Sequence, residues 1–246
     1  MLIRYLSDLH LEFIKPEDIN DFIKQIPINN NDEICILAGD IGNPYQSNYY
    51  IFMDFINNNF KKSFVIAGNH EYYNNNINDT NIYLKEFFSE FKNISFLNNS
   101  YEYYEGYYFV GSILWSKIID PRYKINDIYK INNMNFNYYN ELNKICIDFL
   151  EETVYDNTII ITHHMPSESL IDIKYKTPNM MPYNQYFYSN MDNFIERNKD
   201  KIKCWIYGHT HSPNIKLIHD IPFLCNPIGY PNENTNIDFN KTYTLI

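Results

Sequence analysis

Residues 203–211 read Lys-Cys-Trp-Ile-Tyr-Gly-His-Thr-His and pass from an apolar run directly into paired histidines. A short run of apolar and aromatic residues that is bounded by a turn signal predicts a buried strand over Lys203–Tyr207. Gly208 then allows the backbone to turn sharply, so that the following side chains can face a crevice. Because a strand end with two imidazoles has few structural uses, His209 and His211 indicate a functional site.

Four more polar clusters follow apolar runs in the same way. They are Ser7-Asp8-Leu9-His10, Ala38-Gly39-Asp40, Ala67-Gly68-Asn69-His70-Glu71 and Thr162-His163-His164-Met165-Pro166. Six of the seven histidines lie in these five clusters, and only His219 lies outside them. Active sites of α/β proteins gather at the carboxyl ends of the strands, so we expect the clusters to converge.

The rest of the pattern favours an α/β fold, because predicted strands and helices alternate along much of the chain. Strands are predicted at Leu2–Leu6, Glu33–Leu37, Ser63–Ile66, Tyr107–Ile113, Thr158–Ile161, Lys203–Tyr207 and Phe223–Cys225. Helices are predicted at Pro16–Ile26, Tyr49–Asn57, Ile82–Phe91, Asn140–Val154 and Asn190–Arg197. The sequence contains no repeat and no linker that would divide the chain.

The composition is that of a globular protein of 246 residues, with 45% apolar and 20% charged residues. A formal charge of −10 opposes a protein whose whole surface binds nucleic acid, because such a surface is normally basic. A local site for an anion stays compatible with this charge, because bound divalent metals reverse the local field. Extended nucleic acid is therefore not an expected partner.

The four cysteines, Cys35, Cys146, Cys204 and Cys225, form no CxxC pair. Cys35 and Cys204 lie inside apolar runs, which predicts buried free thiols and indicates a reducing compartment. No stretch approaches the roughly 20 apolar residues of a membrane span, and Met1–Leu6 is too short for the core of a signal peptide. We therefore expect a cytoplasmic protein with no membrane partner.

The stretch Tyr101–Tyr108 is dense in aromatic residues. Such a stretch could stack a nucleic-acid base. An amphipathic hairpin at the edge of a sheet is favoured instead, because tyrosine suits a half-buried strand surface.

The residue types of the clusters indicate metal chemistry. Carboxylate with imidazole suits zinc, iron and manganese, while the absence of cysteine opposes a structural zinc or iron–sulfur site. Asp8 and His10 are two residues apart, so in extended backbone both side chains would point the same way, and His209 and His211 repeat this spacing. Asp40 is the natural bridge, because one carboxylate can bind two cations. Two metals about 3.5–4 Å apart can hold a phosphate, deprotonate a water between them and stabilise the leaving oxygen.

Each cluster alone also has a structural interpretation. The pair Asp8 and His10 fits a capped turn, and Gly39-Asp40 is a common turn dipeptide. Residues 68–71 could form a turn, and His163-His164 could be core imidazoles that are satisfied by hydrogen bonds. All five clusters together, each after an apolar run, favour the catalytic interpretation.

These motifs resemble the signature of the calcineurin-like metallophosphoesterases, DxH…GD…GNH[DE]…H…GHxH, from Asp8 to His211. A subgroup of small phosphohydrolases is similar over longer stretches, namely Gly68–Tyr73, Gly111–Trp115, Thr162–Ser167 and Cys225–Pro231, and its pattern includes Phe239. The resemblance implies a four-layer α/β/β/α sandwich of two sheets flanked by helices. It also implies a single domain over residues 1–246.

The resemblance further implies two metal ions, with manganese, zinc and iron as the candidates. In the family pattern one ion is held by Asp8, His10, Asp40 and His211. The second is held by Asp40, Asn69, His163 and His209. His70 matches the family's proton donor or stabiliser of the leaving group, and Glu71 occupies the position that orients it. His164 and Asn226 are candidates for contacts behind the ligands or with substrate.

We therefore expect a hydrolase of small phosphomonoesters or phosphodiesters, with a metal-bridging hydroxide as the nucleophile. One alternative is a binding or scaffold module that keeps the fold but has lost catalysis, which the full set of ligands and His70 oppose. Another is a nuclease for long nucleic acid, which would show a basic stripe beside the metals. Since the only arginines are Arg4, Arg122 and Arg197, an arginine clamp for a polyanionic substrate is not expected.

Overall fold

The computed structural model describes residues 1–28, 32–233 and 237–245, and its core is a pair of β-sheets. The first sheet has the strand order β11-β1-β2-β3-β4. Its strands are β1 (Leu2–Leu6), β2 (Ile34–Ala38), β3 (Lys62–Ile66), β4 (Ile94–Phe96) and β11 (Thr242–Thr244). Strands β1 to β4 pair in parallel, and β11 adds an antiparallel edge against β1.

The second sheet has the order β5-β6-β7-β8-β10-β9. Its strands are β5 (Ser100–Tyr104), β6 (Tyr107–Ser112), β7 (Thr158–Thr162), β8 (Ile202–Tyr207), β9 (Asn214–Ile218) and β10 (Ile221–Cys225). The inner strands β6, β7, β8 and β10 are parallel, whereas β5 and β9 are antiparallel edges. Parallel inner strands place their carboxyl ends together, which creates the edge where the site lies.

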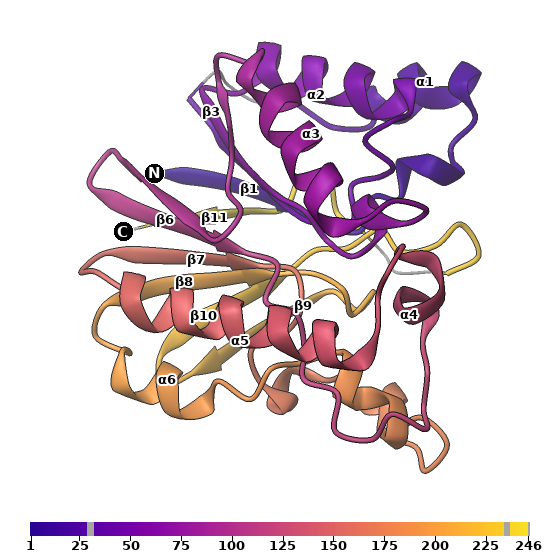
Figure 1. Ribbon diagram of the computed structural model, residues 1–246. Helices are drawn as coiled ribbons and strands as arrows, with labels where there is room; N and C mark the ends of the chain where they lie inside the picture. Colours follow the sequence, from indigo (N-terminus) through magenta and orange to yellow (C-terminus); the bar gives the residue numbers. More distant parts are fainter. Residues whose placement is uncertain (29–31, 234–236, 246) are drawn as a thin grey trace.

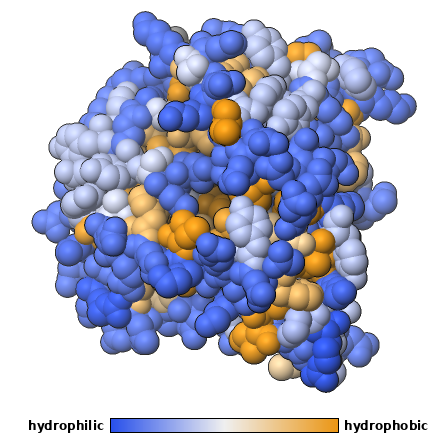
Figure 2. All heavy atoms as spheres, viewed as in Figure 1, coloured by the Kyte–Doolittle hydropathy of each residue, from blue (hydrophilic) through white to orange (hydrophobic). Residues whose placement is uncertain are grey.

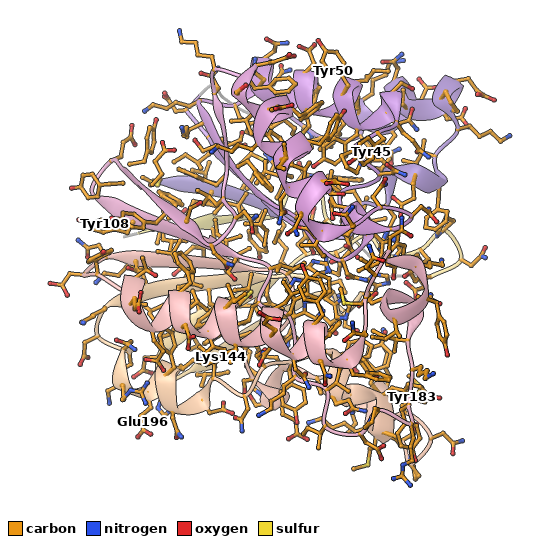
Figure 3. All side chains as sticks on the ribbon, in the orientation of Figure 1. Tyr45, Tyr50, Tyr108, Lys144, Tyr183 and Glu196 are labelled. Carbon is orange, nitrogen blue, oxygen red and sulfur yellow. The ribbon has the colours of Figure 1, made fainter. Side chains whose placement is uncertain are left out.

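Helices cover the outer face of each sheet, so the molecule has the expected four layers (Figure 1). The helices are α1 (Ile19–Ile23), α2 (Ser47–Asn59), α3 (Ile77–Ser89), α4 (Asn126–Lys130), α5 (Phe136–Thr153) and α6 (Asp192–Arg197). Tyr50 of α2 lies on one helical layer, and Lys144 of α5 and Glu196 of α6 lie on the opposite layer (Figure 3). The chain therefore has the α/β sandwich that the sequence predicts.

Successive side chains of a strand point to opposite faces of the sheet, and the core is therefore divided into two parts. In β2, Ile34 and Ile36 pack between the sheets, whereas Cys35 and Leu37 pack in the larger core with residues of the helices. Across the two sheets, the rings of Phe64 and Phe109 stack with centroids 3.9 Å apart. The strands are buried on both faces, which explains why they appear in the sequence as continuous apolar runs.

Several predicted elements have different bounds in the structure. The predicted helix Pro16–Ile26 is a 3-10 turn, Pro16–Asp18, followed by the short α1. Helix α5 begins at Phe136, earlier than predicted, because the side chain of Asn135 accepts hydrogen bonds from two backbone N–H groups of the first turn. Four short elements, β4, β9, β11 and α4, are not among those predicted from the sequence.

The stretch Tyr101–Tyr108 forms an edge hairpin, in which Tyr101 and Tyr103 are exposed, as predicted. The four cysteines are free and buried.

None of the helices in the described part of the chain is long and apolar enough to cross a membrane. Hydrophilic side chains predominate on the face seen in Figure 2, where apolar ones form only scattered patches.

Candidate metal centre

The seven candidate ligands lie on loops that leave the carboxyl ends of five strands (Figure 1). Asp8 and His10 follow β1, Asp40 follows β2, Asn69 follows β3, His163 follows β7, and His209 and His211 follow β8. The Oδ2 atom of Asp40 lies 3.9 Å from Nε2 of His10 and 3.3 Å from Nε2 of His163. Residues as far apart in the sequence as His10 and His211 thus converge on one buried cluster.

The backbone at five of these residues is left-handed. The φ angles are 52° at Asp8, 50° at His10, 53° at Asp40, 67° at His209 and 44° at His211. The extended backbone predicted for the two i, i+2 pairs is therefore wrong. Leu9 and Thr210, which lie between the paired ligands, are buried as well, at 2% and 1% exposure. Such strained conformations in non-glycine residues cluster at functional sites, where the surrounding structure enforces them.

Two glycines permit the close approach of the strand ends. Gly39 has a φ of +82°, and a Cβ atom there would lie 2.7 Å from Nδ1 of His163. Gly68 is constrained by space instead, since its Cβ would lie 2.1 Å from Oδ1 of Asp40. The absence of a side chain at Gly68 therefore leaves room for the Asp40 carboxylate.

The first group of ligands is Asp8, His10 and His211. The Nδ1 atom of His10 faces a carboxylate oxygen of Glu12 at 3.1 Å, and Nδ1 of His211 faces Glu233. Because a carboxylate accepts hydrogen bonds, both rings carry a proton on Nδ1, and in the neutral form each ring presents a lone pair at Nε2. Yet the two Nε2 atoms lie 3.1 Å apart, and Nε2 of His211 lies 3.4 Å from Asp8. Two ring nitrogens and a carboxylate oxygen that face one another in this way can bind a cation between them.

The second group consists of Asp40, His163 and His209, and Asn69 lies beside it. Here too, atoms that accept hydrogen bonds face one another. The Nδ1 atom of His163 donates to the carbonyl oxygen of Ala38 at 3.0 Å, which leaves Nε2 as an acceptor when the ring is neutral. That Nε2 lies 3.0 Å from Oδ1 of Asn69 and 3.2 Å from Nδ1 of His209. The donor set therefore fits two cations, one in each group, with Asp40 lying between them.

The electrostatics of the cluster favour positive charge. Burial alone would raise the pKa of Asp40, but His163 and His70 hold it well below its usual range. Burial alone would lower the pKa of His163, but the Asp40 carboxylate raises it to about 9. Hydrogen bonding to Asp8 likewise overcomes burial and raises the pKa of His211 to about 10. The same carboxylates attract a divalent cation, whose binding displaces protons from the imidazoles.

His70 lies beside this cluster, with Nε2 4.0 Å from Oδ2 of Asp40. Its Nδ1 lies 2.8 Å from an oxygen of Glu12, and its Nε2 lies 3.0 Å from the hydroxyl of Tyr230. Burial alone would lower the pKa of His70, but the carboxylates of Asp40 and Glu12 raise it. Hydrogen bonds from the two imidazoles outweigh burial for Glu12 and lower its pKa to about 2.

The predicted role of Glu71 in orienting His70 is corrected by the hydrogen bonds. Both oxygens of Glu71 accept backbone N–H groups, from Gly68 at 2.7 Å, Ile41 at 2.8 Å and Asp40 at 3.1 Å. Burial raises the pKa of this carboxyl to about 8. Glu71 therefore ties the loop after β3 to the loop after β2, and the carboxylate that contacts His70 is Glu12.

His164 and Asn226 brace the site from behind. The ring of His164 lies against His209 with centroids 4.2 Å apart, and its Nδ1 lies 3.3 Å from the carbonyl oxygen of Ile113. Burial lowers the pKa of His164 to about 3, so this ring is neutral. The amide of Asn226 donates to the carbonyl oxygens of Tyr5 and Asp238, and thereby joins β1 to the C-terminal segment.

A sequence model described as calcineurin-like phosphoesterase matches residues 1–213. The chain belongs to this calcineurin-like phosphoesterase family. Family membership and the acidic and histidine groups of the site support a metal-dependent phosphoester hydrolase in general terms.

Similar proteins are consistent with this family assignment. The uncharacterized protein L509 of Acanthamoeba polyphaga mimivirus is 31% identical over 269 residues, which cover 96% of this chain and 94% of that protein. The crystal structure of phosphopantetheinyl hydrolase from Mycobacterium tuberculosis superposes with a TM-score of 0.73 at 15% identity, covering 93% of this chain and 89% of that one. The structure of TT1561 from Thermus thermophilus gives 0.54 at 12% identity, covering 92% and 88%. At these identities the two structures show a shared fold.

Five residues of this phosphoesterase site had no role in the sequence analysis. They are Glu12, Tyr73, Asp127, Tyr230 and Glu233. Tyr73 and Tyr230 lie inside the subgroup motifs, and Glu12 follows His10 by two residues. The position of each of these three residues in the sequence could therefore have indicated that it belongs to the site. Asp127 lies on α4, 58 residues from the Asn69 amide that donates to it at 2.9 Å, and no local pattern marks it.

The three arginines of the chain are held in ion pairs. Arg4 is fully buried and pairs with Glu33 at 2.8 Å. Arg122 pairs with Asp120 at 2.5 Å, and Arg197 pairs with Glu151 at 2.6 Å. The sequence-based expectation that no arginine clamp serves the site agrees with these contacts.

Proposed function

We propose that this phosphoesterase hydrolyses small phosphate esters, either monoesters or diesters, at two metal ions. One ion would be held by Asp8, His10, Asp40 and His211, and the other by Asp40, Asn69, His163 and His209. The observation that carries the proposal is the opposition of hydrogen-bond acceptors, with the Nε2 atoms of His10 and His211 at 3.1 Å. When bound, di- or trivalent cations at such a site supply Lewis acidity toward phosphoryl oxygens and activate water.

In this proposal His70 supports departure of the leaving group. Its Nε2 atom lies near both Asp40 and the hydroxyl of Tyr230, at the edge of the cluster. A raised pKa favours the imidazolium form, in which Nε2 holds a proton that can be donated to the departing oxygen. Tyr230 covers the cluster, because its ring lies 4.6 Å from that of His10 and 4.7 Å from that of His211.

The surroundings of the site support a substrate of limited negative charge. All three arginines are engaged elsewhere. Lys174 lies near His211, with Nζ 3.5 Å from the backbone oxygen of that residue. Lys174 beside two metals suits a single phosphate group, whereas a polyphosphate or a long nucleic acid needs a basic stripe.

The test is a panel assay with para-nitrophenyl phosphate, its bis-ester and cyclic nucleotides, each with manganese, zinc or nickel. We expect turnover of at least one ester with at least one metal, and no turnover above background in Asp40→Ala. Glu17→Gln changes an exposed acidic residue and serves as the matched control with parental activity. If the metal-loaded parent hydrolyses none of the esters, the binding-module alternative replaces this proposal.

A further inference from the structure

A third acidic and histidine cluster, His10, Glu12 and His70, lies beside the two groups of candidate ligands. We infer that Glu12 is a positioning residue that holds the Nδ1 proton of both histidines, so that both Nε2 atoms face the reaction centre. This inference rests on the proposed function. It assigns one carboxylate to two tasks, the alignment of a metal ligand and the alignment of the proton donor.

The geometry places a single oxygen between two rings. The Oε1 atom of Glu12 lies 3.1 Å from Nδ1 of His10 and 2.8 Å from Nδ1 of His70. The rings lie edge to face with centroids 4.4 Å apart. The other oxygen, Oε2, is buried and has no hydrogen-bond partner among residues 1–28, 32–233 and 237–245. The side-chain hydrogen bonds of Glu12 in the described residues are therefore made by Oε1.

The backbone fixes the position of this oxygen. Glu12 lies in the one-turn 3-10 helix Leu11–Phe13, which begins directly after the left-handed His10. The N–H groups of His10 and Leu11 donate to the carbonyl oxygens of Asp40 and Ile41, at 3.0 and 2.9 Å. The turn is thus attached to the loop that carries the bridging carboxylate, so Glu12 has little freedom to move.

Tautomer control follows from the acceptor chemistry of the carboxylate. An ionised carboxylate has no proton to donate, so each facing Nδ1 must carry one. A hydrogen bond at one ring nitrogen decides what the other nitrogen can do. For His10 the free Nε2 faces His211, and for His70 it faces Tyr230. Carboxylates that contact metal-binding histidines typically change metal affinity or activity by about 10–100-fold when they are removed.

Two variants separate positioning from general loss of structure. Glu12→Ala removes the acceptor, while Glu12→Gln keeps an oxygen that can accept the same two bonds. Glu17→Gln is the control for loss of an acidic side chain in the adjacent exposed turn. Thermal melting of all three variants establishes that each is folded before any comparison is made.

The first readout is independent of activity. Nitrogen-15 NMR of the imidazoles, in the metal-free and the zinc-loaded protein, reports the proton position on each ring, and the signal of His70 is identified by its loss in His70→Ala. At a pH high enough to make the His70 ring neutral, we expect Nδ1–H at His70 in the parent and in Glu12→Gln, and a shift toward Nε2–H in Glu12→Ala. An unchanged His70 tautomer in a folded Glu12→Ala protein overturns the inference.

The second readout is the dependence on the leaving group. We expect Glu12→Ala to lower kcat for an alkyl phosphate by about 10²-fold and to lower kcat for para-nitrophenyl phosphate about tenfold, because the activated leaving group needs less protonation. KM should change little, and Glu12→Gln should recover part of the loss. An equal loss on both esters contradicts the alignment of His70 by Glu12. If the parent hydrolyses neither ester, the proposed function fails, and the NMR result still decides the tautomer.

Discussion

The Nε2 atoms of His10 and His211 lie 3.1 Å apart, while the Nδ1 atom of each ring faces a carboxylate. Two nitrogen lone pairs at this separation repel each other unless a proton or a cation lies between them. A metal ion relieves the repulsion at both rings at once, because neutral imidazole is a common metal ligand. The stability of the fold should therefore depend on the metal.

Removal of metal should lower the melting temperature. Without it, Asp8 and Asp40 remain buried close to one another, and burial of charge is costly. A ligand present at 100 times its Kd adds about 2.7 kcal/mol of stability, which corresponds to about 5–10 °C for a chain of this size. Melting curves before and after chelation, with re-addition of manganese or zinc, measure this effect. A curve that stays unchanged after elemental analysis has confirmed metal loss contradicts the site.

His70→Ala should keep the fold and the metals but lose most turnover of an alkyl ester. A positioned proton donor contributes about 10²–10⁴ in rate. The loss should be smaller for para-nitrophenyl phosphate, because its leaving group departs readily as the anion. Steady-state kinetics on both esters, with metal content measured on the same samples, test the assignment. If His70→Ala turns over the alkyl ester at the parental rate, His70 is not the acid.

Asp127→Ala should weaken the second metal. The Asn69 amide donates to Asp127 at 2.9 Å and to the hydroxyl of Tyr73 at 3.1 Å, and these two bonds turn Oδ1 toward His163. Loss of such a support typically costs about 10–100-fold in metal affinity. Titration calorimetry with manganese should show one weakened site, and the exposed Asp200→Ala should leave both sites as in the parent. Equal affinities in Asp127→Ala and parent show that Asp127 does not orient the ligand.

The buried thiols should make the protein sensitive to high pH. Burial raises the pKa of Cys35 and of Cys204 from the ordinary value of 9.0 to about 12. The folded state thus holds these protons more tightly than the unfolded state, and stability is complete below pH 9 and falls as the pH rises toward 12. The slope of the urea midpoint between pH 8 and 10 should be negative, and it should be shallower in Cys204→Ala. An identical slope in both proteins contradicts the thiol contribution.

The motif residues and the main strands were predictable because their signals are local. An apolar run followed by Gly208-His209 records both a strand and its functional end within one short stretch. The edge strand β9 gave no such signal, since three of its five residues are exposed and its partners lie only in β10. The helix α4 has five residues, too few for a helical period to appear.

Within the site, the convergence of the candidate ligands followed from the sequence, but their backbone conformation did not. His10 and His211 were predicted on extended chain, whereas both are left-handed. That strain is imposed by contacts between distant segments, such as the bond from the N–H of His209 to Asp8, 201 residues away. Asp127 was missed for the same reason, because its contact with Asn69 exists only when separate loops meet.

Counting metal ions in the parent and in Asp40→Ala tests the central claim most directly. Both proteins are loaded with manganese, freed of unbound metal and analysed for metal per chain, and turnover of a responsive ester is measured on the same samples. Since Asp40 lies within reach of both groups, we predict two ions per parent chain, and loss of tight binding together with turnover in the variant. A parent that turns over ester without bound metal, or an Asp40→Ala protein that retains both ions and full turnover, would contradict the dinuclear centre.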